Sequence, residues 1–348
     1  MNIDDKEKGE RRRPGFPVNF LLFLNRPVFE SESFRLLPPL RYRLLVLAGL
    51  AAAGVALLPS PDTHGDEVAP APQVAELAPT LYLPVDVNHR VERWMRRYLT
   101  DQRQQFELYL AREGLYSEMI REALRERELP EDLIYLAAIE SAFTPTATSS
   151  VSAAGIWQFM GPTAEEFGLR IDSYVDERRD PIRATEAALD YLQALHDQFG
   201  SWYLAAAAYN AGPGRVAQAL RTRPEAEVGD ETIYWDIIEH LPLETREYVP
   251  KILAAILLSR AAETYGFHLV ERRSPVDFDR VWVPGGTSLN RVAGSLDVPP
   301  ARIRELNPHL IRGITPPGGL FPLRVPPGQT SRLVASMGNR WRTIAVDD

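Results

Sequence analysis

The chain has 348 residues, of which 45% are hydrophobic and 25% charged, as is typical of globular protein with two domains or one domain and appendages. Its formal net charge of -8, without a basic stripe carrying aromatics, argues against a nucleic-acid partner. The absence of cysteine excludes disulfides, thiolate metal ligands, a cysteine nucleophile and a lipid-modified cysteine. The six histidines show no metal-ligand spacing, so we expect neither a metal nor a cofactor.

The N-terminal region has the pattern of a targeting segment. Residues 44–58 are uncharged and mostly apolar, follow Arg41 and Arg43, and end at Pro59. We predict a signal or membrane-anchor segment there, preceded by a cytoplasmic segment at 1–43 whose basic residues keep it inside. The stretch falls short of the roughly 20 apolar residues of a full span, and its cleavage stays open. A buried core helix is the alternative, which the polar, proline-rich sequence that follows disfavours.

A helical region follows a linker. Residues 59–84 are rich in proline, alanine and acids, which is typical of a linker. Residues 85–268 show no alternating strand pattern, and apolar faces recur with helical period near 87–99, 106–110, 116–124, 184–199 and 246–262. This pattern predicts an all-α domain.

The composition changes after Phe267, where valine, proline and glycine replace the alanine-rich helices. Two short strands are predicted at 281–284 and 323–326, with short helices at 289–295 and 300–306 between them. We therefore expect a small βααβ module at 275–330, followed by a tail at 331–348.

Glu140 is the first candidate for chemistry. It ends an apolar, helix-forming run that begins at Leu133, so its carboxyl group is expected to be partly buried. Burial disfavours the charged form and raises the pKa, which suits a general acid at neutral pH. The alternative is an exposed glutamate at a helix end.

The residues after Glu140 suit a loop that approaches a ligand. Small residues surround Gly155, and Gln158 offers a hydrogen-bond donor and an acceptor. Trp157 is either an apolar platform for a sugar ring or a residue of the core. Further on, Tyr209 and Asn210 precede a glycine turn that ends a helix. That turn either presents both side chains to a ligand or serves only as a helix stop.

Together these stretches resemble the transglycosylase domain of the soluble-lytic-transglycosylase type, in the branch of the membrane-bound lytic murein transglycosylase D. Order and spacing fit over roughly residues 87–265. The shared motifs are Leu129-Pro130-Glu131-Asp132-Leu133, Glu140-Ser141, Gly155-Ile156-Trp157-Gln158, Gly168-Leu169, Asp176-Glu177-Arg178-Arg179-Asp180-Pro181, Ala207-Ala208-Tyr209-Asn210-Ala211-Gly212 and Glu244-Thr245-Arg246-Glu247-Tyr248-Val249-Pro250-Lys251.

The resemblance implies a lysozyme-like all-α fold and cleavage of the β-1,4 bond between N-acetylmuramic acid and N-acetylglucosamine in peptidoglycan. It places Glu140 as the single catalytic acid and base. The implied sugar-cleft residues are Ser149, Gln158, Met160 and Tyr209, with Asn210 and Tyr248 near the cleft. Many relatives have glycine at Ser152, which makes the local loop conformation less certain. We interpret residues 176–180 as a structural ion-pair cluster.

One carboxyl group suffices for the implied reaction. Glu140 first protonates the glycosidic oxygen and then accepts the proton of the sugar's own C6 hydroxyl, which closes a 1,6-anhydro ring. A second carboxylate beside Glu140, from Glu165, Glu166 or Asp176, would instead make a hydrolytic muramidase. A cell-wall-binding scaffold that does not cut glycan is the alternative from another class.

The C-terminal module resembles a LysM domain, a resemblance carried by Gly285-Gly286-Thr287-Ser288-Leu289, Leu306-Asn307-Pro308 and Leu323-Arg324-Val325-Pro326. That implies binding of N-acetylglucosamine-containing glycan, although a packing domain without ligand is possible. As a tether, it would raise the effective concentration of the enzyme on the wall. Deleting 275–348 would then weaken attachment to insoluble wall more than cleavage of short soluble glycans. The expected partners are peptidoglycan strands and, through 44–58, a membrane, with a periplasmic catalytic domain in the cell envelope, anchored or secreted.

Overall fold

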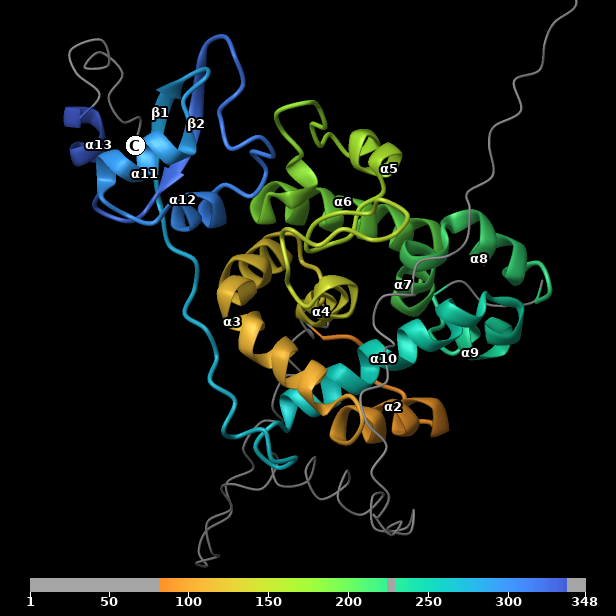
Figure 1. Cartoon of the computed structure of the whole chain (residues 1–348). Coiled ribbons are helices and arrows are strands. Elements are labelled where there is room, and N and C mark those ends of the chain that lie inside the picture. The colour runs from red at the N-terminus through yellow and green to blue at the C-terminus, as the bar shows by residue number, and fades with distance from the viewer. Residues whose placement is uncertain (1–81, 224–228, 337–348) are drawn as a thin grey trace, which may run out of the picture.

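The computed structural model describes residues 82–223 and 229–336 (Figure 1). The predicted segments at 1–43 and 44–58, most of the linker at 59–84, and residues 337–348 lie outside these described residues. Within the described ranges, none of the helices combines the length and the apolar character that crossing a membrane requires.

Helices make up the described part of the chain up to Arg260, as predicted (Figure 1). They are α2 (His89–Leu99), α3 (Arg103–Glu126), α4 (Ile134–Ser141), α5 (Gly161–Glu166), α6 (Pro181–Phe199), α7 (Trp202–Ala211), α8 (Pro213–Leu220), α9 (Ile233–Ile237) and α10 (Leu243–Arg260), with short 3-10 turns at Glu131–Leu133, Glu177–Arg179 and Ile238–His240. Helix α10 packs against α2, α4 and α7, and α6 packs against α7. The alanine run Ala205–Ala208 of α7 is buried in the resulting core.

The predicted helices near 106–110 and 116–124 are one continuous helix, α3, so the predicted break between them was wrong. Its middle turn is polar, but it is held by tertiary contacts. Glu113 is buried there and forms ion pairs with Arg121 of the same helix, at 2.8 Å, and with Arg272 of a later segment, at 3.2 Å. At Gly114 a Cβ would lie 2.1 Å from the carbonyl oxygen of Arg273, so the absence of a side chain lets a later segment pack on the helix.

Helix α10 contains a proline, and the structure compensates for it. Pro250 has no N–H to donate to the carbonyl of Arg246 one turn earlier. The buried hydroxyl of Tyr234 donates to that carbonyl at 3.3 Å and to the carbonyl of Thr245 at 2.9 Å. These bonds fix the helical turn that carries Tyr248.

The C-terminal module has the predicted order of strand, two helices and strand. Strand β1 (Asp279–Pro284) pairs antiparallel with β2 (Leu320–Val325), and helices α11 (Leu289–Leu296) and α12 (Pro300–Leu306) lie between them in the chain. Strand β2 begins earlier than predicted because Leu320 pairs with Pro284. A further helix, α13 (Thr330–Ser336), places Leu333 in the module's own hydrophobic core.

Candidate active site

Glu140 sits at the last turn of α4, where the chain leaves the helix sharply. The helix ends because Ala142 adopts a left-handed conformation with φ 50°. Next to Glu140, the Ser141 hydroxyl donates to the carbonyl of Ile156 at 2.8 Å. The end of α4 is thereby tied to the following loop, which fixes the direction of the Glu140 side chain.

The environment of Glu140 raises the pKa of its carboxyl to about 7, against an ordinary value of 4.5. Burial is the largest cause, since it penalises the charged form. The hydroxyl of Tyr248 donates to Oε1 of Glu140 at 2.7 Å and lowers the pKa in opposition. The charge of Glu244 raises it and that of Lys251 lowers it. A carboxyl balanced in this way can give and take a proton near neutral pH.

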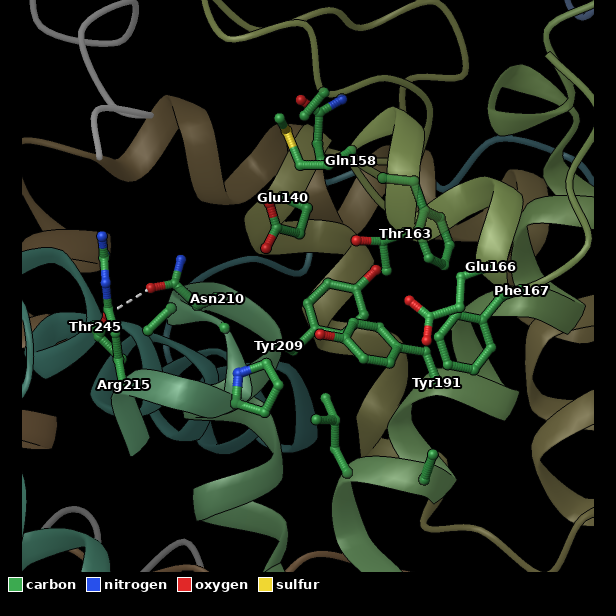
Figure 2. A pocket seen from close by; sticks show the side chains of 18 of the residues that line it. Glu140, Gln158, Thr163, Glu166, Phe167, Tyr191, Tyr209, Asn210, Arg215 and Thr245 are labelled. Atoms are coloured by element: carbon green, nitrogen blue, oxygen red, sulfur yellow. Dashed lines mark hydrogen bonds between the residues drawn. The ribbon is translucent and has the colours of Figure 1, made fainter. Parts of the chain in front are cut away.

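Glu140 opens onto a cavity of about 630 Å³ (Figure 2). Figure 2 shows its carboxyl between Gln158 and Tyr209. The lining comes from α4, the loop after it, α5, α6, α7, the start of α8 and the start of α10. It comprises Glu140, Val151, Ala153, Gln158, Phe159, Met160, Thr163, Glu166, Phe167, Tyr191, Ala194, Leu195, Gln198, Tyr209, Asn210, Ala211, Gly212, Pro213, Arg215, Pro242, Glu244 and Thr245. Such a mixture of apolar surface and a few polar groups is typical of a ligand site.

Aromatic rings form one wall of the cavity. The rings of Tyr209 and Tyr191 lie 5.3 Å apart, and Phe167 lies 4.9 Å from Tyr191. The Tyr209 hydroxyl donates to the carbonyl of Trp157 at 2.8 Å, which ties α7 to the loop. The wall therefore offers ring faces and edges beside Glu140.

Asn210 is held by α10. Its Oδ1 accepts a hydrogen bond from the Thr245 hydroxyl at 2.8 Å, and its Nδ2 donates to Oε1 of Glu244 at 3.4 Å. The first bond defines the amide orientation. Asn210 and Glu244 thus present polar atoms to the cavity in a fixed arrangement.

Trp157 is a core residue and not a sugar platform. Its side chain is fully buried, and Nε1 donates to the hydroxyl of Thr185 at 2.9 Å. Of the two interpretations of Trp157 from the sequence, stacking on a sugar was therefore wrong. Its burial anchors the loop, so that Gln158, with φ 50°, turns into the cavity. There Nε2 of Gln158 donates to the carbonyl of Gly155 at 2.8 Å.

The structure brings together five of the seven residues that the sequence nominated: Glu140, Gln158, Met160, Tyr209 and Asn210 all line the cavity. Tyr248 is buried and reaches Glu140 through its hydrogen bond. Ser149 is not among the lining residues; its Oγ accepts hydrogen bonds from the backbone N–H groups of Val151 and Ala153 and closes a turn.

The carboxylates considered for a second role are separated by the fold. Glu166 lines the cavity, whereas Glu165 does not. Asp176 is buried in an ion pair with Arg178 at 2.9 Å, in agreement with the structural interpretation of the cluster. Glu244 also lines the cavity, a site residue that was not predicted although it begins the motif at 244–251. Within the described residues, no three histidine, cysteine or acidic side chains are grouped so as to hold a metal ion.

Two family matches cover the two parts of the chain. Residues 118–230 match the transglycosylase SLT domain. Residues 277–337 match the LysM-like domain of lytic transglycosylase MltD. The chain carries an SLT domain followed by an MltD-type LysM-like domain. The predicted class, a mainly α fold with a lysozyme-like all-α domain and a small βααβ module, agrees with these matches.

Characterised relatives support the same assignment of the SLT domain. The chain is 33% identical over 228 residues to membrane-bound lytic murein transglycosylase D of Escherichia coli K12, which covers 65% of this chain and 49% of that protein. It is also 33% identical over 146 residues to the soluble lytic murein transglycosylase of the same strain, covering 40% of this chain and 22% of that one. The chain thus spans about half the length of the first relative and less than a quarter of the second.

Solved structures of relatives cover parts of the chain. An inactive variant of lytic transglycosylase Slt from Pseudomonas aeruginosa shares 31% identity over 44% of this chain and 24% of that one, with a TM-score of 0.33. The 70 kDa soluble lytic transglycosylase from Escherichia coli shares 26% identity over 52% of this chain and 31% of that one, with a TM-score of 0.36.

Proposed function

We propose that this protein is a peptidoglycan lytic transglycosylase that cleaves the β-1,4 bond between N-acetylmuramic acid and N-acetylglucosamine without consuming water. The observation that carries the proposal is Glu140 itself. It is a partly buried carboxyl with a pKa of about 7 at the wall of a cavity of about 630 Å³. The SLT domain match and the two murein transglycosylase relatives supply the substrate class.

The proposed reaction balances with one carboxyl group. Protonated Glu140 gives its proton to the glycosidic oxygen as the bond from that oxygen to the anomeric carbon breaks. The ionised Glu140 then accepts the proton of the C6 hydroxyl while O6 bonds to the anomeric carbon. The product ends in a 1,6-anhydro ring, and Glu140 is again protonated. The C6 hydroxyl is already held beside the reacting carbon, so it replaces water with a large effective-molarity advantage.

The groups around Glu140 have separate tasks in this scheme. Tyr248 steadies the carboxylate after it has lost its proton, because the hydroxyl donates to Oε1 at 2.7 Å. Asn210 and Gln158 offer amide groups to sugar hydroxyl and acetamido groups. The Tyr191 and Tyr209 rings offer apolar surface to the sugar faces. Ser149, by its place in a turn, shapes the loop that carries Gln158.

A hydrolytic muramidase is the second candidate, and one observation favours it. Glu166 and Glu244 both line the cavity that Glu140 lines. In glycoside hydrolases a second carboxylate activates water or attacks the sugar. If Glu166 or Glu244 took that role, the same cleft would release a reducing end instead of an anhydro end.

The nature of the product decides between these candidates. Purified full-length protein is incubated with purified peptidoglycan in oxygen-18 water, and the released muropeptides are weighed by mass spectrometry. Products lighter by one water than hydrolytic products, without oxygen-18, are expected. Products that carry the heavy oxygen would establish the muramidase.

The variant Glu140→Gln distinguishes an enzyme from a non-catalytic scaffold. We expect this variant to lose turnover while it retains its fold and its binding to insoluble peptidoglycan. Glu165→Gln is the matched control, because Glu165 is an exposed carboxyl on the neighbouring α5 that does not line the cavity. Wild-type protein that binds peptidoglycan but releases no product would favour the scaffold.

We also propose that the protein works in the cell envelope, with residues 44–58 directing export or anchoring and the SLT domain on the periplasmic side. The substrate class and the name of the relative support this. Fractionation of cells that produce the full chain, with and without residues 1–58, tests it. Retention of the wild-type chain in the cytoplasm would contradict it.

Binding of N-acetylglucosamine-containing glycan by the LysM-like domain is part of the same proposal, and co-sedimentation with insoluble peptidoglycan tests it.

A further inference from the structure

The two domains share a segment that each of them needs. Residues 172–180, here called the bridging segment, connect α5 to α6. Val175 is 1% exposed and belongs to the hydrophobic core of the LysM-like domain. The backbone N–H of Asp176 donates to the carbonyl of His309 at 2.9 Å, and that of Ile311 donates to the carbonyl of Tyr174 at 3.1 Å. The LysM-like core is therefore completed by a residue from the other domain.

A buried ion pair closes the same interface. Nη2 of Arg324 donates to both carboxylate oxygens of Asp180, at 2.8 and 2.7 Å. Both residues are buried, and Asp180 also caps the N-terminus of α6 by accepting from the N–H of Ile182. On the other side, Asn307 bonds both the N–H and the carbonyl of Arg324, which fixes its backbone on β2. A pair held in this way is costly to break, because removing one partner leaves a buried charge.

The bridging segment also holds the loop that lines the cavity, residues 147–160, here called the cleft loop. Asp176 orients Arg178, whose Nη1 donates to the carbonyl of Ser152 at 2.8 Å and of Phe159 at 3.2 Å. Gly155 lies against the segment so closely that a Cβ would be 1.6 Å from the carbonyl oxygen of Arg178. The cleft loop is thereby packed on the segment that Arg324 holds from the other side.

The chain between the domains is attached as well. The N–H of Arg273 donates to the carbonyl of Ala111 at 2.9 Å, and the N–H of Val276 donates to the carbonyl of Leu115 at 3.1 Å. This connection runs along α3 to β1 (Figure 1). The LysM-like domain is thus fixed to the SLT domain by its connection as well as by its interface.

We infer that the LysM-like domain is a fixed part of the catalytic unit and that Arg324 is a positioning residue, which through Asp180 and the bridging segment holds the cleft loop in place beside Glu140. This inference rests on the proposed function. It changes the expectation for the LysM-like domain. A flexible tether would matter only on insoluble wall, whereas a fixed support also matters for short soluble glycans.

Hydrogen exchange tests the structural step without any need for activity. Arg324→Met removes the buried cation, and Arg302→Met is the control, because Arg302 is an exposed arginine of the same domain that forms a surface ion pair with Glu305 at 3.8 Å. We expect amides of the cleft loop to exchange about tenfold faster in Arg324→Met, while amides of α4 and α10 stay as protected as in wild type. Cleft-loop exchange equal to that of Arg302→Met would overturn the inference.

Turnover tests the functional step. On a short soluble oligosaccharide of alternating N-acetylglucosamine and N-acetylmuramic acid, Arg324→Met should lower kcat about tenfold or more, through misplacement of cavity groups. Arg324→Lys, which keeps the charge, should restore part of kcat. Binding to insoluble peptidoglycan should change less than kcat. If kcat on the soluble substrate stayed at the wild-type value, Arg324 would have no positioning role.

A double variant keeps the test valid if Arg324→Met alone fails to fold. Asp180→Asn with Arg324→Met leaves no unpaired buried charge, and asparagine caps a helix about as well as aspartate. The same faster exchange in the cleft loop is expected for it. Wild-type protein that releases no product would refute the proposed function alone, since the exchange experiment would still decide whether Arg324 holds the cleft loop.

Discussion

The hydroxyl of Tyr248 donates a hydrogen bond of 2.7 Å to Oε1 of Glu140, across 108 positions of sequence. Tyr248 comes from α10 and Glu140 from α4, two helices that pack directly on each other. The bond favours the charged carboxylate, whereas burial favours the neutral acid. The two opposing effects leave the pKa of Glu140 at about 7, where one group can serve as acid and then as base.

Tyr248→Phe should therefore shift the pH profile. Glu140 must be protonated to act as acid, so activity falls as pH rises through its pKa. Without the hydrogen bond the pKa of Glu140 rises further, and this fall should move to higher pH by roughly one pH unit. The measurement is kcat/KM against pH. Tyr203→Phe is the control, a buried tyrosine whose hydroxyl donates to the carbonyl of Pro84; an equal shift in that variant would contradict the assignment.

The raised pKa of Glu140 also predicts a pH-dependent stability. The folded state holds the Glu140 proton up to about pH 7, whereas the unfolded state releases it near its ordinary value of 4.5. The folded state binds more protons between these values, so this group's contribution to stability is present at low pH and declines as pH rises from 4.5 to 7. The decline amounts to about 3 kcal/mol.

Glu140→Gln removes that decline. At pH 8 the variant should be more stable than wild type by up to about 3 kcal/mol, while at pH 4 the two should differ little. Urea unfolding at both pH values measures the difference. Glu166→Gln, which removes an exposed carboxyl from the same cavity, is the control. Equal stability of Glu140→Gln and wild type at pH 8 would show that Glu140 is not held neutral by burial.

Gly155→Ala tests the packing of the cleft loop on the bridging segment. Gly155 has φ 86°, and a Cβ would lie 1.6 Å from the carbonyl oxygen of Arg178. We expect a loss of at least about 2 kcal/mol in the free energy of unfolding, together with lower kcat. Gly294→Ala is the matched control in helix α11, where no atom lies within 4 Å of the added Cβ, and it should gain up to about 1 kcal/mol. A neutral Gly155→Ala would mean that the loop is free to move.

The sequence was a good guide where a signal is local. The helical period located the helices of the SLT domain, and alternating apolar residues located β1 and β2. The apolar run before Glu140 correctly predicted a carboxyl with reduced solvent contact, because helix periodicity and burial act over neighbouring residues. Local pattern failed at α3, where a polar turn looked like a break and is instead stabilised by contacts with Arg272 and Arg273 from a later segment.

The site was less predictable because its parts come from distant helices. Trp157 could be a core residue or a sugar platform, and only the position of Thr185 on α6 decides for the core. Nothing in the residues next to Glu244 indicates that its carboxylate lines the same cavity as Glu140. The same holds for Arg324, whose partner Asp180 lies 144 positions away and belongs to the other domain. Tertiary docking, which periodicity does not encode, determines these contacts.

Glu244→Gln should act in the opposite direction to Tyr248→Phe. The negative charge of Glu244 raises the pKa of Glu140, so its removal should lower that pKa and move the fall in activity to lower pH. Glu166→Gln leaves the charge of Glu244 in place and serves as the control. For both variants kcat/KM is measured against pH on the short soluble oligosaccharide. The anhydro product should be unchanged in both variants. A Glu244→Gln variant that lost all turnover over the whole pH range, with its fold and peptidoglycan binding intact, would instead make Glu244 the second catalytic carboxylate and the enzyme a muramidase.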